Sequence, residues 1–366
     1  MATFIGLMSG TSLDGVDAVL AHIDDAQLKV LAHSHTPFEP TLRAELLALN
    51  TSGADELHRS ALAANALSRV YSSLVQHLLK ASGVTAQEVR AIGAHGQTVR
   101  HRPGEFDGTG YTHQLNNPAL LAELTGITVV ADFRSRDVAA GGQGAPLVPA
   151  FHQAMFAQPG QTVAVLNVGG MANLSVVRDT AVTGWDCGPG NALMDAWCEQ
   201  HTGAAYDHEG NWAASGVVSA SLLSKLQQAT YFDAQPPKST GRDMFHLPWL
   251  LQHVDGTNLA AQDVQATLCE LSAWACAKDV QMHAADAQAL AVCGGGALNA
   301  HFMRRLSALL PGVEVLRTDA WGLPVMQVEA AAFAWLAYKT LRGEPANLPK
   351  ATGAQGARVL GAIYPA

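Results

Sequence analysis

Clustered glycine is the feature that most constrains how this chain of 366 residues can fold. Its 34 glycines gather mainly in short clusters, and each cluster borders an apolar run rich in Val, Ile or Leu. The clusters are Gly6–Gly15, Gly93–Gly96, Gly141–Gly144, Gly169–Gly170, Gly188–Gly190 and Gly294–Gly296. Between them lie Ala- and Leu-rich stretches with helical spacing, such as Ala61–Lys80 and Ala330–Leu341. Short strands that end in glycine turns and alternate with helices predict an α/β protein.

Length and composition limit the class further. At ~150 residues per domain, the chain predicts about two domains. Its 48% hydrophobic and 14% charged residues describe a well-buried globular protein. A net charge of -9 disfavours nucleic acid and anionic membranes as partners, although a local pocket could still bind an anionic small molecule.

The compartment follows from what the sequence lacks. The N-terminus has no basic segment of a secretory signal, and no apolar run is long enough to span a bilayer. Its five cysteines include no C-x-x-C pair, which argues against a disulfide framework or a zinc site. We therefore expect a reducing, cytoplasmic compartment.

Two segments that lie half a chain apart share one pattern. Phe4–Ala21 predicts a strand, a turn of small polar residues and a second strand, and Val163–Val177 repeats this plan. Such hairpins are common in α/β proteins, so chance similarity is one interpretation. Internal duplication is the other, with two similar domains that each open on a phosphate-facing hairpin.

A third element supports nucleotide binding. Ala289–Gly295 predicts a buried strand, and a helix is expected over Ala297–Leu310. Glycines at such a turn let the backbone approach a ligand, and the helix N-terminus favours negative charge. With the two hairpins, this turn matches the nucleotide clamp of the actin, hexokinase and Hsp70 superfamily.

Signatures of other enzyme classes are missing from the sequence. It contains no P-loop, no G-x-S-x-G elbow and no H-E-x-x-H motif. The fifteen histidines show no metal-ligand spacing. His33 and His35 could share one strand face, and a surface pair is the favoured interpretation.

Seven short blocks stand in order along nearly the whole chain. They are GLMSGTSLDGVD (6–17), GAHGQT (93–98), ADFR (131–134), GGQGAPL (141–147), NVGGMAN (167–173), DCGPGN (186–191) and CGGGALN (293–299). The ordered set resembles the signature of the anhydro-N-acetylmuramic acid kinases. Segments 26–90 and 206–234 match no block.

The resemblance implies a two-domain actin-like ATPase (ribonuclease H-like) fold with a nucleotide cleft between the domains. We expect domains over 1–145 and 146–344, with the tail from about 345 to 366 packed on the first. The implied activity uses ATP and water to open 1,6-anhydro-N-acetylmuramic acid, which gives N-acetylmuramic acid 6-phosphate and ADP during cytoplasmic recycling of cell-wall peptidoglycan. A homodimer fits the family.

The resemblance also places ATP on the first hairpin. The residues concerned are Gly10, Thr11, Ser12, Leu13, Asp14, Gly15, Val16 and Asp17. Backbone N–H groups and hydroxyls at its tip could donate to the β- and γ-phosphates, whereas Asp14 could equally be an ordinary turn residue. Asp17 could hold Mg²⁺ through water. The second hairpin and the late turn add Asn167, Gly169, Gly170, Gly294, Gly295 and Gly296.

Asp186 is the predicted catalytic base. We expect it at the end of a strand and before a glycine turn, where α/β folds bind their ligands. It could instead cap the following helix, but Pro189 and Asn191 supply a helix start without it. Asp195, inside that helix, is a further candidate.

Four residues are predicted to contact or orient the sugar. They are His95, Gln97, Arg134 and Glu329. Arg134 could pair with the lactyl carboxylate, or form a surface ion pair with Asp132 or Asp137. The carboxylate of Glu329 interrupts an apolar helix and is costly to bury alone, which favours a position in the cleft.

Two other functions fit the same superfamily. A sugar kinase could act on a free hydroxyl, and activity on N-acetylmuramic acid itself would reveal that. A nucleotide-driven binding protein of the Hsp70 type would need a peptide-binding domain, and only about two dozen residues follow Leu341.

Overall fold

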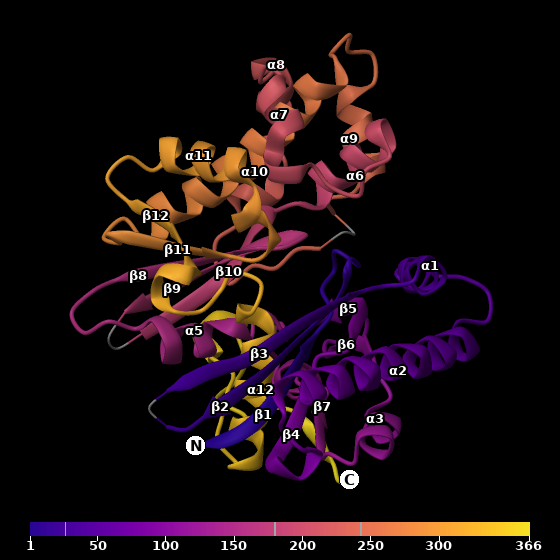
Figure 1. The fold of residues 1–366 in the computed structure, drawn as a ribbon. Coiled ribbons are helices and arrows are strands. Elements are labelled where there is room, and N and C mark those ends of the chain that lie inside the picture. Colours follow the sequence, from indigo (N-terminus) through magenta and orange to yellow (C-terminus); the bar gives the residue numbers. More distant parts are fainter. Residues whose placement is uncertain (26, 179–180, 242–243) are drawn as a thin grey trace. The chain divides into compact units, whose positions relative to one another are not determined.

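The structure is a computed structural model that describes residues 1–25, 27–178, 181–241 and 244–366 (Figure 1). It divides into two compact units. Unit 1 comprises Met1–Met155 and Gln327–Ala366, and unit 2 comprises Phe156–Met326. The division therefore differs from the boundaries expected from the sequence, because the chain returns to unit 1 at residue 327 instead of about 345.

Unit 1 contains a six-stranded sheet with the order β13-β7-β4-β1-β2-β3 and a two-stranded sheet of β5 and β6. The strands are β1 (Ala2–Met8), β2 (Gly15–Ile23), β3 (Leu28–Pro37), β4 (Val89–Ala94), β5 (Gln97–Pro103), β6 (Gly110–Leu115), β7 (Val129–Ala131) and β13 (Ala362–Tyr364). The helices are α1 (Pro40–Ala48), α2 (Glu56–Ser82), α3 (Pro118–Thr125), α4 (Ser135–Ala139), α5 (Val148–Phe156), α12 (Val328–Leu341) and α13 (Pro349–Thr352), with a 3-10 turn at Ala86–Glu88. The tail joins this unit through β13, which pairs antiparallel with β7.

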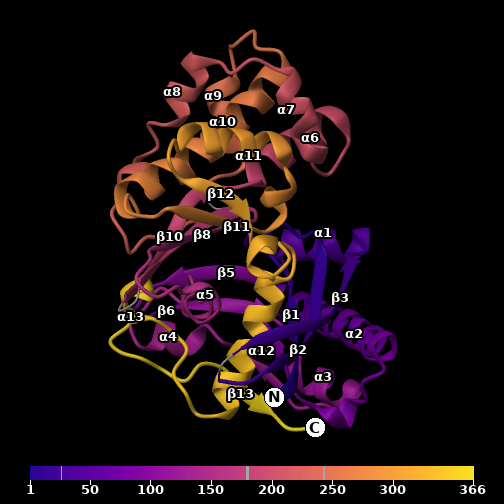
Figure 2. The same ribbon diagram turned by 60° about the vertical axis from the view of Figure 1, so that its left-hand side comes forward.

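Helix α12 belongs to unit 1 because glycines let it lie directly on the sheet, as Figures 1 and 2 show for α12 beside β1 and β2. A Cβ on Gly6 would overlap the carbonyl oxygen of Ala330, and a Cβ on Gly93 would overlap that of Phe333. These two members of the glycine clusters therefore serve close helix-to-sheet packing, and any other residue there would push α12 away.

Unit 2 contains a five-stranded sheet with the order β10-β9-β8-β11-β12. The strands are β8 (Val163–Val168), β9 (Met171–Arg178), β10 (Ala181–Pro189), β11 (Ala289–Cys293) and β12 (Glu314–Arg317). The helices are α6 (Ala192–Thr202), α7 (Asn211–Ser215), α8 (Ala220–Leu226), α9 (Leu247–Val254), α10 (Ala261–His283) and α11 (Ala300–Leu309), and 3-10 turns lie at His208–Gly210 (η2), Thr230–Asp233 (η3), Gly295–Leu298 (η4) and Thr318–Trp321 (η5). Helix α10 packs on β9 and β10 within one hydrophobic core.

The two main sheets share one topology. In each, the first three strands form an antiparallel meander, and the first strand pairs in parallel with a fourth, which pairs in parallel with a fifth. This is the strand order of ribonuclease H-like domains, and the predicted α/β actin-like fold is confirmed. The shared topology extends far beyond the hairpins and is what an internal duplication would produce.

Candidate functional site

The tip of the β1–β2 hairpin is held by side chains from other parts of unit 1. The hydroxyl of Ser9 donates to the carbonyl of Gly96 (3.0 Å) and lies 2.9 Å from the hydroxyl of Tyr71. The imidazole Nδ1 of His95 lies 3.1 Å from the Ser9 carbonyl, and Gln97 Nε2 donates to the Gly10 carbonyl at 3.1 Å. The carbonyl oxygens of Ser9 and Gly10 therefore point toward side chains of unit 1.

The ATP-binding segment divides into buried and accessible residues. Leu13 and Val16 lie in the hydrophobic core, so only their backbones could meet a nucleotide. Thr11 and Asp14 are exposed, and the Ser12 hydroxyl donates to Asp14 Oδ1 at 2.7 Å. The structure therefore supports the turn interpretation of Asp14, whose carboxylate orders the tip.

Asp17 lies on β2 opposite His35 of β3. Its Oδ1 is 2.9 Å from His33 Nε2 and 3.3 Å from His35 Nδ1, so the two histidines share a strand face and both contact it. Burial opposes ionisation, but the hydrogen bonds from His33 and His35 outweigh it and lower the pKa of Asp17, and the Asp17 carboxylate raises the pKa of His35. Contact with the carboxylate thus replaces the simple surface pair expected for the histidines.

This arrangement limits how Asp17 could serve a metal ion. Within the described residues, no group of three or more His, Cys, Asp or Glu side chains is arranged to hold a metal ion. Asp17 Oδ1 already faces two imidazoles, so the carboxylate fits a water-mediated contact to Mg²⁺ rather than a metal cage made by the protein.

The buried His95 and the half-buried Arg134 form a pair beside the hairpin. Arg134 donates to His95 Nε2 from Nε (3.2 Å) and Nη2 (3.0 Å), and its Nη1 donates to the Gly144 carbonyl at 2.8 Å. Burial, reinforced by the Arg134 charge, lowers the pKa of His95 to about 3. The ring is therefore neutral, with Nδ1 donating to Ser9 and Nε2 accepting from Arg134.

Asp137 does not pair with Arg134, contrary to one of the alternatives. Its buried carboxylate accepts from the Gly144 N–H (2.8 Å), from Asn347 Nδ2 (2.6 Å) and from the Thr352 hydroxyl (2.8 Å). The C-terminal segment thereby fixes the loop whose carbonyl accepts from Arg134. Sequence reasoning missed this anchor, although a carboxylate beside a glycine loop is a visible signal.

Gln97 and Glu329, two of the predicted sugar contacts, differ in their burial. Gln97 is buried, and among the described residues no group donates to its Oε1. Such an orphaned acceptor is costly unless a ligand or water completes it. Glu329 is half-buried in the first turn of α12.

The β8–β9 hairpin of unit 2 is held by backbone instead. Its tip is the pair Gly169 and Gly170, and the N–H groups of residues 190–192 at the start of α6 donate to their carbonyls at 2.8–3.1 Å. A Cβ on Gly190 would overlap the Gly169 carbonyl, which explains the glycine there.

The late glycine turn lies against the end of β8. Cys293 of β11 pairs with Asn167, and a Cβ on Gly294, whose φ is +78°, would crowd Asn167 Oδ1. Our expectation of a helix from residue 297 was wrong in detail. Residues Gly295–Leu298 form a 3-10 turn, and α11 begins at Ala300 because Asn299 caps it by accepting from the Phe302 N–H (2.9 Å).

Asp186 lies within β10 rather than at its end, since the strand continues to Pro189 across a bulge. The residue is 9% exposed. Its Oδ2 accepts from the Thr240 N–H (3.0 Å), and its own N–H donates to the Lys238 carbonyl (3.2 Å). The segment at 238–240, which no sequence block covered, therefore brackets the predicted base.

Asp186 belongs to a polar row across three strands. Asn167 pairs with Asn173, and Asn173 pairs with Asp186, so the three side chains share one sheet face. Asn173 Oδ1 is buried, and no described residue donates to it. Asn173 was part of a matched block but was not chosen from the sequence.

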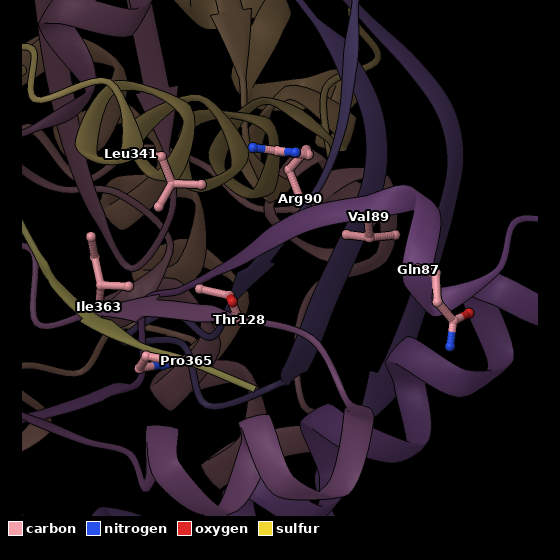
Figure 3. Close-up of a pocket in the computed structure, with 7 residues that line it drawn as sticks. All are labelled: Gln87, Val89, Arg90, Thr128, Leu341, Ile363 and Pro365. Atoms are coloured by element: carbon pink, nitrogen blue, oxygen red, sulfur yellow. The ribbon is translucent and has the colours of Figure 1, made fainter.

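A cavity of about 440 Å³ elsewhere in unit 1 contains none of these residues (Figure 3). Gln87, Val89, Arg90 and Thr128 line it together with Leu341, Ile363 and Pro365. No helix of the described segments combines the length and apolarity that crossing a membrane requires.

Comparisons with known proteins give matches that cover nearly the whole chain. The sequence model of the family "Anhydro-N-acetylmuramic acid kinase" matches residues 2–366. The protein of that name from Variovorax paradoxus (strain S110) is 61% identical, over 99% of both chains, and that from Pseudomonas putida (strain KT2440) is 53% identical, over 100% of both. A solved reductive activator for a corrinoid, iron-sulfur protein has a TM-score of 0.51 at 12% identity, covering 93% of this chain and 62% of its own.

Proposed function

Because the chain belongs to the anhydro-N-acetylmuramic acid kinase family, we propose that it opens 1,6-anhydro-N-acetylmuramic acid with ATP and water. The products would be N-acetylmuramic acid 6-phosphate and ADP. Full-length matches to named kinases of this family support the proposal. The reaction would serve peptidoglycan recycling in the cytoplasm, with the enzyme as a homodimer.

The substrate dictates what the protein must supply. In a 1,6-anhydro sugar, O6 is bonded to the anomeric carbon C1, so no free 6-hydroxyl exists to attack ATP. A water must attack C1 while the C1–O6 bond breaks. O6 then bonds to the γ-phosphorus, and the bond from that phosphorus to ADP breaks. The step combines the base-activated water of an inverting glycosidase with phosphoryl transfer.

The carboxylate of Asp186 is the observation that carries this mechanism. It is buried and oriented by the Thr240 N–H, as a general base must be. It would accept the proton that the attacking water loses and later release it to solvent. The N-cap of α6 is Asn191, and Asp186 Oδ2 accepts from the Thr240 N–H, which favours the catalytic interpretation over helix capping.

Two regions would bind ATP, the second substrate. In unit 1, small residues at the hairpin tip (Gly10, Thr11 and Ser12) allow backbone and hydroxyl donors to approach the phosphates. In unit 2, the glycines of the tip at Gly169–Gly170 and of the turn at Gly294–Gly296 would likewise let the backbone approach the nucleotide closely. Asp17 would hold Mg²⁺ through water, and this ion would neutralise phosphate charge.

Sugar contacts are proposed on the cluster around Arg134. Its guanidinium would meet the lactyl carboxylate, and the orphaned Gln97 Oε1 would accept from the sugar. His95, neutral and bonded to both neighbours, would orient Arg134 as well as contact the sugar. Glu329 would orient the sugar or the reacting water.

Reaction in ¹⁸O-labelled water tests the proposal directly. We expect the label on the anomeric hydroxyl and none in the phosphate. Label in the phosphate would mean attack at phosphorus and would reject the mechanism. Equal turnover of N-acetylmuramic acid would instead favour an ordinary kinase that acts on a free hydroxyl.

A further inference from the structure

A buried ion pair lies beside the proposed base in unit 2. Lys238 Nζ is 3.3 Å from Asp279 Oδ2, and the two side chains are 5% and 4% exposed. The indole N–H of Trp185 donates to the same oxygen at 2.7 Å. A buried ion pair rarely stabilises a protein more than apolar residues of the same volume would. Stability alone therefore does not explain this pair, and its position indicates a role in the site beside it.

Every partner in this network is connected to Asp186. Trp185 precedes it in β10, and the carbonyl of Lys238 accepts its N–H. Two residues later, the Thr240 N–H donates to its carboxylate. The Tyr231 hydroxyl donates to the Asp186 carbonyl at 2.7 Å, and the Lys238 ammonium lies 5.1 Å from the centre of the Tyr231 ring.

The segment that carries Lys238 and Thr240 has little regular structure to hold it. Residues 234–240 form neither helix nor strand, whereas Asp279 lies on the long helix α10 and Trp185 on β10. Asp279 therefore ties the irregular segment to two regular elements at once. Its carboxylate binds both Trp185, which precedes the base in β10, and Lys238, whose carbonyl accepts from the N–H of the base.

We propose that the Lys238–Asp279 pair is a positioning device for the catalytic base, which fixes segment 238–240 so that the Thr240 N–H orients the Asp186 carboxylate. The inference rests on the proposed role of Asp186. Loss of the pair would let the segment move and would misplace the carboxylate relative to the water, and a displacement of about 1 Å can cost 10²-fold in rate.

The test removes both charges and keeps the shape. Lys238→Met combined with Asp279→Asn leaves no unpaired buried charge and retains an acceptor for the Trp185 N–H. We expect kcat to fall about tenfold to 10²-fold, while KM for ATP and the unfolding temperature stay near those of the wild type. The matched control is Glu270→Gln with Arg305→Met, which neutralises another ion pair of α10 and should leave kcat unchanged.

A second pair of variants tests the hydrogen bond itself. Thr240→Pro removes the N–H that binds Asp186, and Thr240→Val removes only the hydroxyl. Only the Pro variant should move the acid limb of the kcat–pH profile to higher pH, because the carboxylate loses a donor that favours its charged form. Among the described residues, the titratable groups Lys238, Asp279, Tyr231 and Cys187 lie near Asp186, and none of them changes between these two variants.

The outcomes separate the inference from the function beneath it. Normal kcat in the charge-neutral double variant, or the same pH profile in both Thr240 variants, would overturn the positioning role, provided that Asp186→Asn still lowers kcat by about 10²-fold or more. Near-normal turnover by Asp186→Asn would overturn the proposed function instead. A lowered kcat that the Glu270–Arg305 control shares would assign the effect to stability and reject the inference.

Discussion

The hairpins that open the two sheets have the same topology but are held in opposite ways. Side chains of Tyr71, His95 and Gln97 hold the tip of β1–β2. Backbone N–H groups at the start of α6 hold the tip of β8–β9. The first arrangement depends on individual side chains and their protonation, whereas the second survives most side-chain changes.

The carboxylates beside the two hairpins also differ in their position and in their partners. In unit 1 the carboxylate is on the middle strand, where Asp17 is bonded to two histidines. In unit 2 the carboxylate is on the outer strand, where Asp186 is bonded to a backbone N–H, and the middle strand carries Asn173. The same topology thus carries one carboxylate that contacts two imidazoles and one that a backbone N–H orients, and we expect the first to serve binding and the second proton transfer.

The largest expected effect separates these two carboxylates. Asp186→Asn should lower kcat by about 10²–10⁴-fold, the range for loss of a general base, with little change in ATP affinity. Asp17→Asn should instead raise the Mg²⁺ concentration needed for half-maximal rate and lower kcat by less than about tenfold once Mg²⁺ saturates. Steady-state kinetics over a Mg²⁺ series measure both. If Asp17→Asn is the more damaging variant at saturating Mg²⁺, our division of roles is wrong.

The next effect tests whether both tips meet phosphate. A Cβ on Gly10 would come no closer than 3.6 Å to neighbouring atoms, and one on Gly169 no closer than 3.7 Å, so neither substitution should disturb folding. We expect Gly10→Val and Gly169→Val each to weaken binding of a non-hydrolysable ATP analogue by about tenfold to 10²-fold, the cost of one or two hydrogen bonds.

Calorimetry on both variants, with Gly53→Val in an exposed loop as control, makes the comparison. Unchanged affinity in one variant alone would assign the phosphates to the other hairpin. Unchanged affinity in both would remove the predicted ATP site.

The sequence predicted the elements that depend on local pattern. The hairpins at Phe4–Ala21 and Val163–Val177 follow from apolar runs broken by small residues, and the structure confirms both. The glycine turn after β11 was also expected, because glycine there allows close backbone approach. These signals lie within a few residues of each other along the chain.

What the sequence could not provide depends on contacts between distant segments. Gly6 and Gly93 belong to clusters from which the sequence predicted only glycine turns, yet they admit α12 to the sheet, and that packing also returns the chain to unit 1. The hydrogen bond from the Thr240 N–H to the Asp186 carboxylate joins residues 54 positions apart. Lys238 and Asp279 lie 41 positions apart, each with polar neighbours in the sequence, so only the fold shows that they are partners.

Acid should loosen the first hairpin and spare the second. Burial, reinforced by Arg134, lowers the pKa of His95 to about 3, whereas an unfolded histidine titrates near 6.5. The unfolded chain therefore binds a proton first, so the stability that neutral His95 contributes is complete above about pH 6.5 and declines as the pH falls. At pH 5.5 the loss is about 1.4 kcal/mol.

Urea unfolding from pH 7 to 5 measures this loss, and hydrogen exchange locates it. Protection should fall at the N–H groups of Leu13 and His95, which donate to carbonyls of the first hairpin, before it falls at those of residues 190–192, which donate to the carbonyls of Gly169 and Gly170 and do not titrate. The His95→Asn variant should take up one proton fewer than the wild type when it unfolds at acid pH. His152, whose pKa burial also lowers to about 3, should account for another proton. Equal acid sensitivity of the two tips would contradict the difference in how they are held.

The smallest effect comes from single hydrogen-bonding groups at each tip. Tyr71→Phe removes only the hydroxyl that contacts Ser9 in the buried interior, and should cost about 1 kcal/mol in the free energy of unfolding. Asn191→Ala removes a long side-chain bond to the Val168 carbonyl (3.3 Å) but keeps its backbone bond to Gly169 (2.8 Å), and should cost about 0.5 kcal/mol or less. Paired urea denaturation at pH 7.5, where His95 is neutral with or without folding, measures the two losses without the acid effect. A larger cost for Asn191→Ala than for Tyr71→Phe would show that side chains also hold the second hairpin.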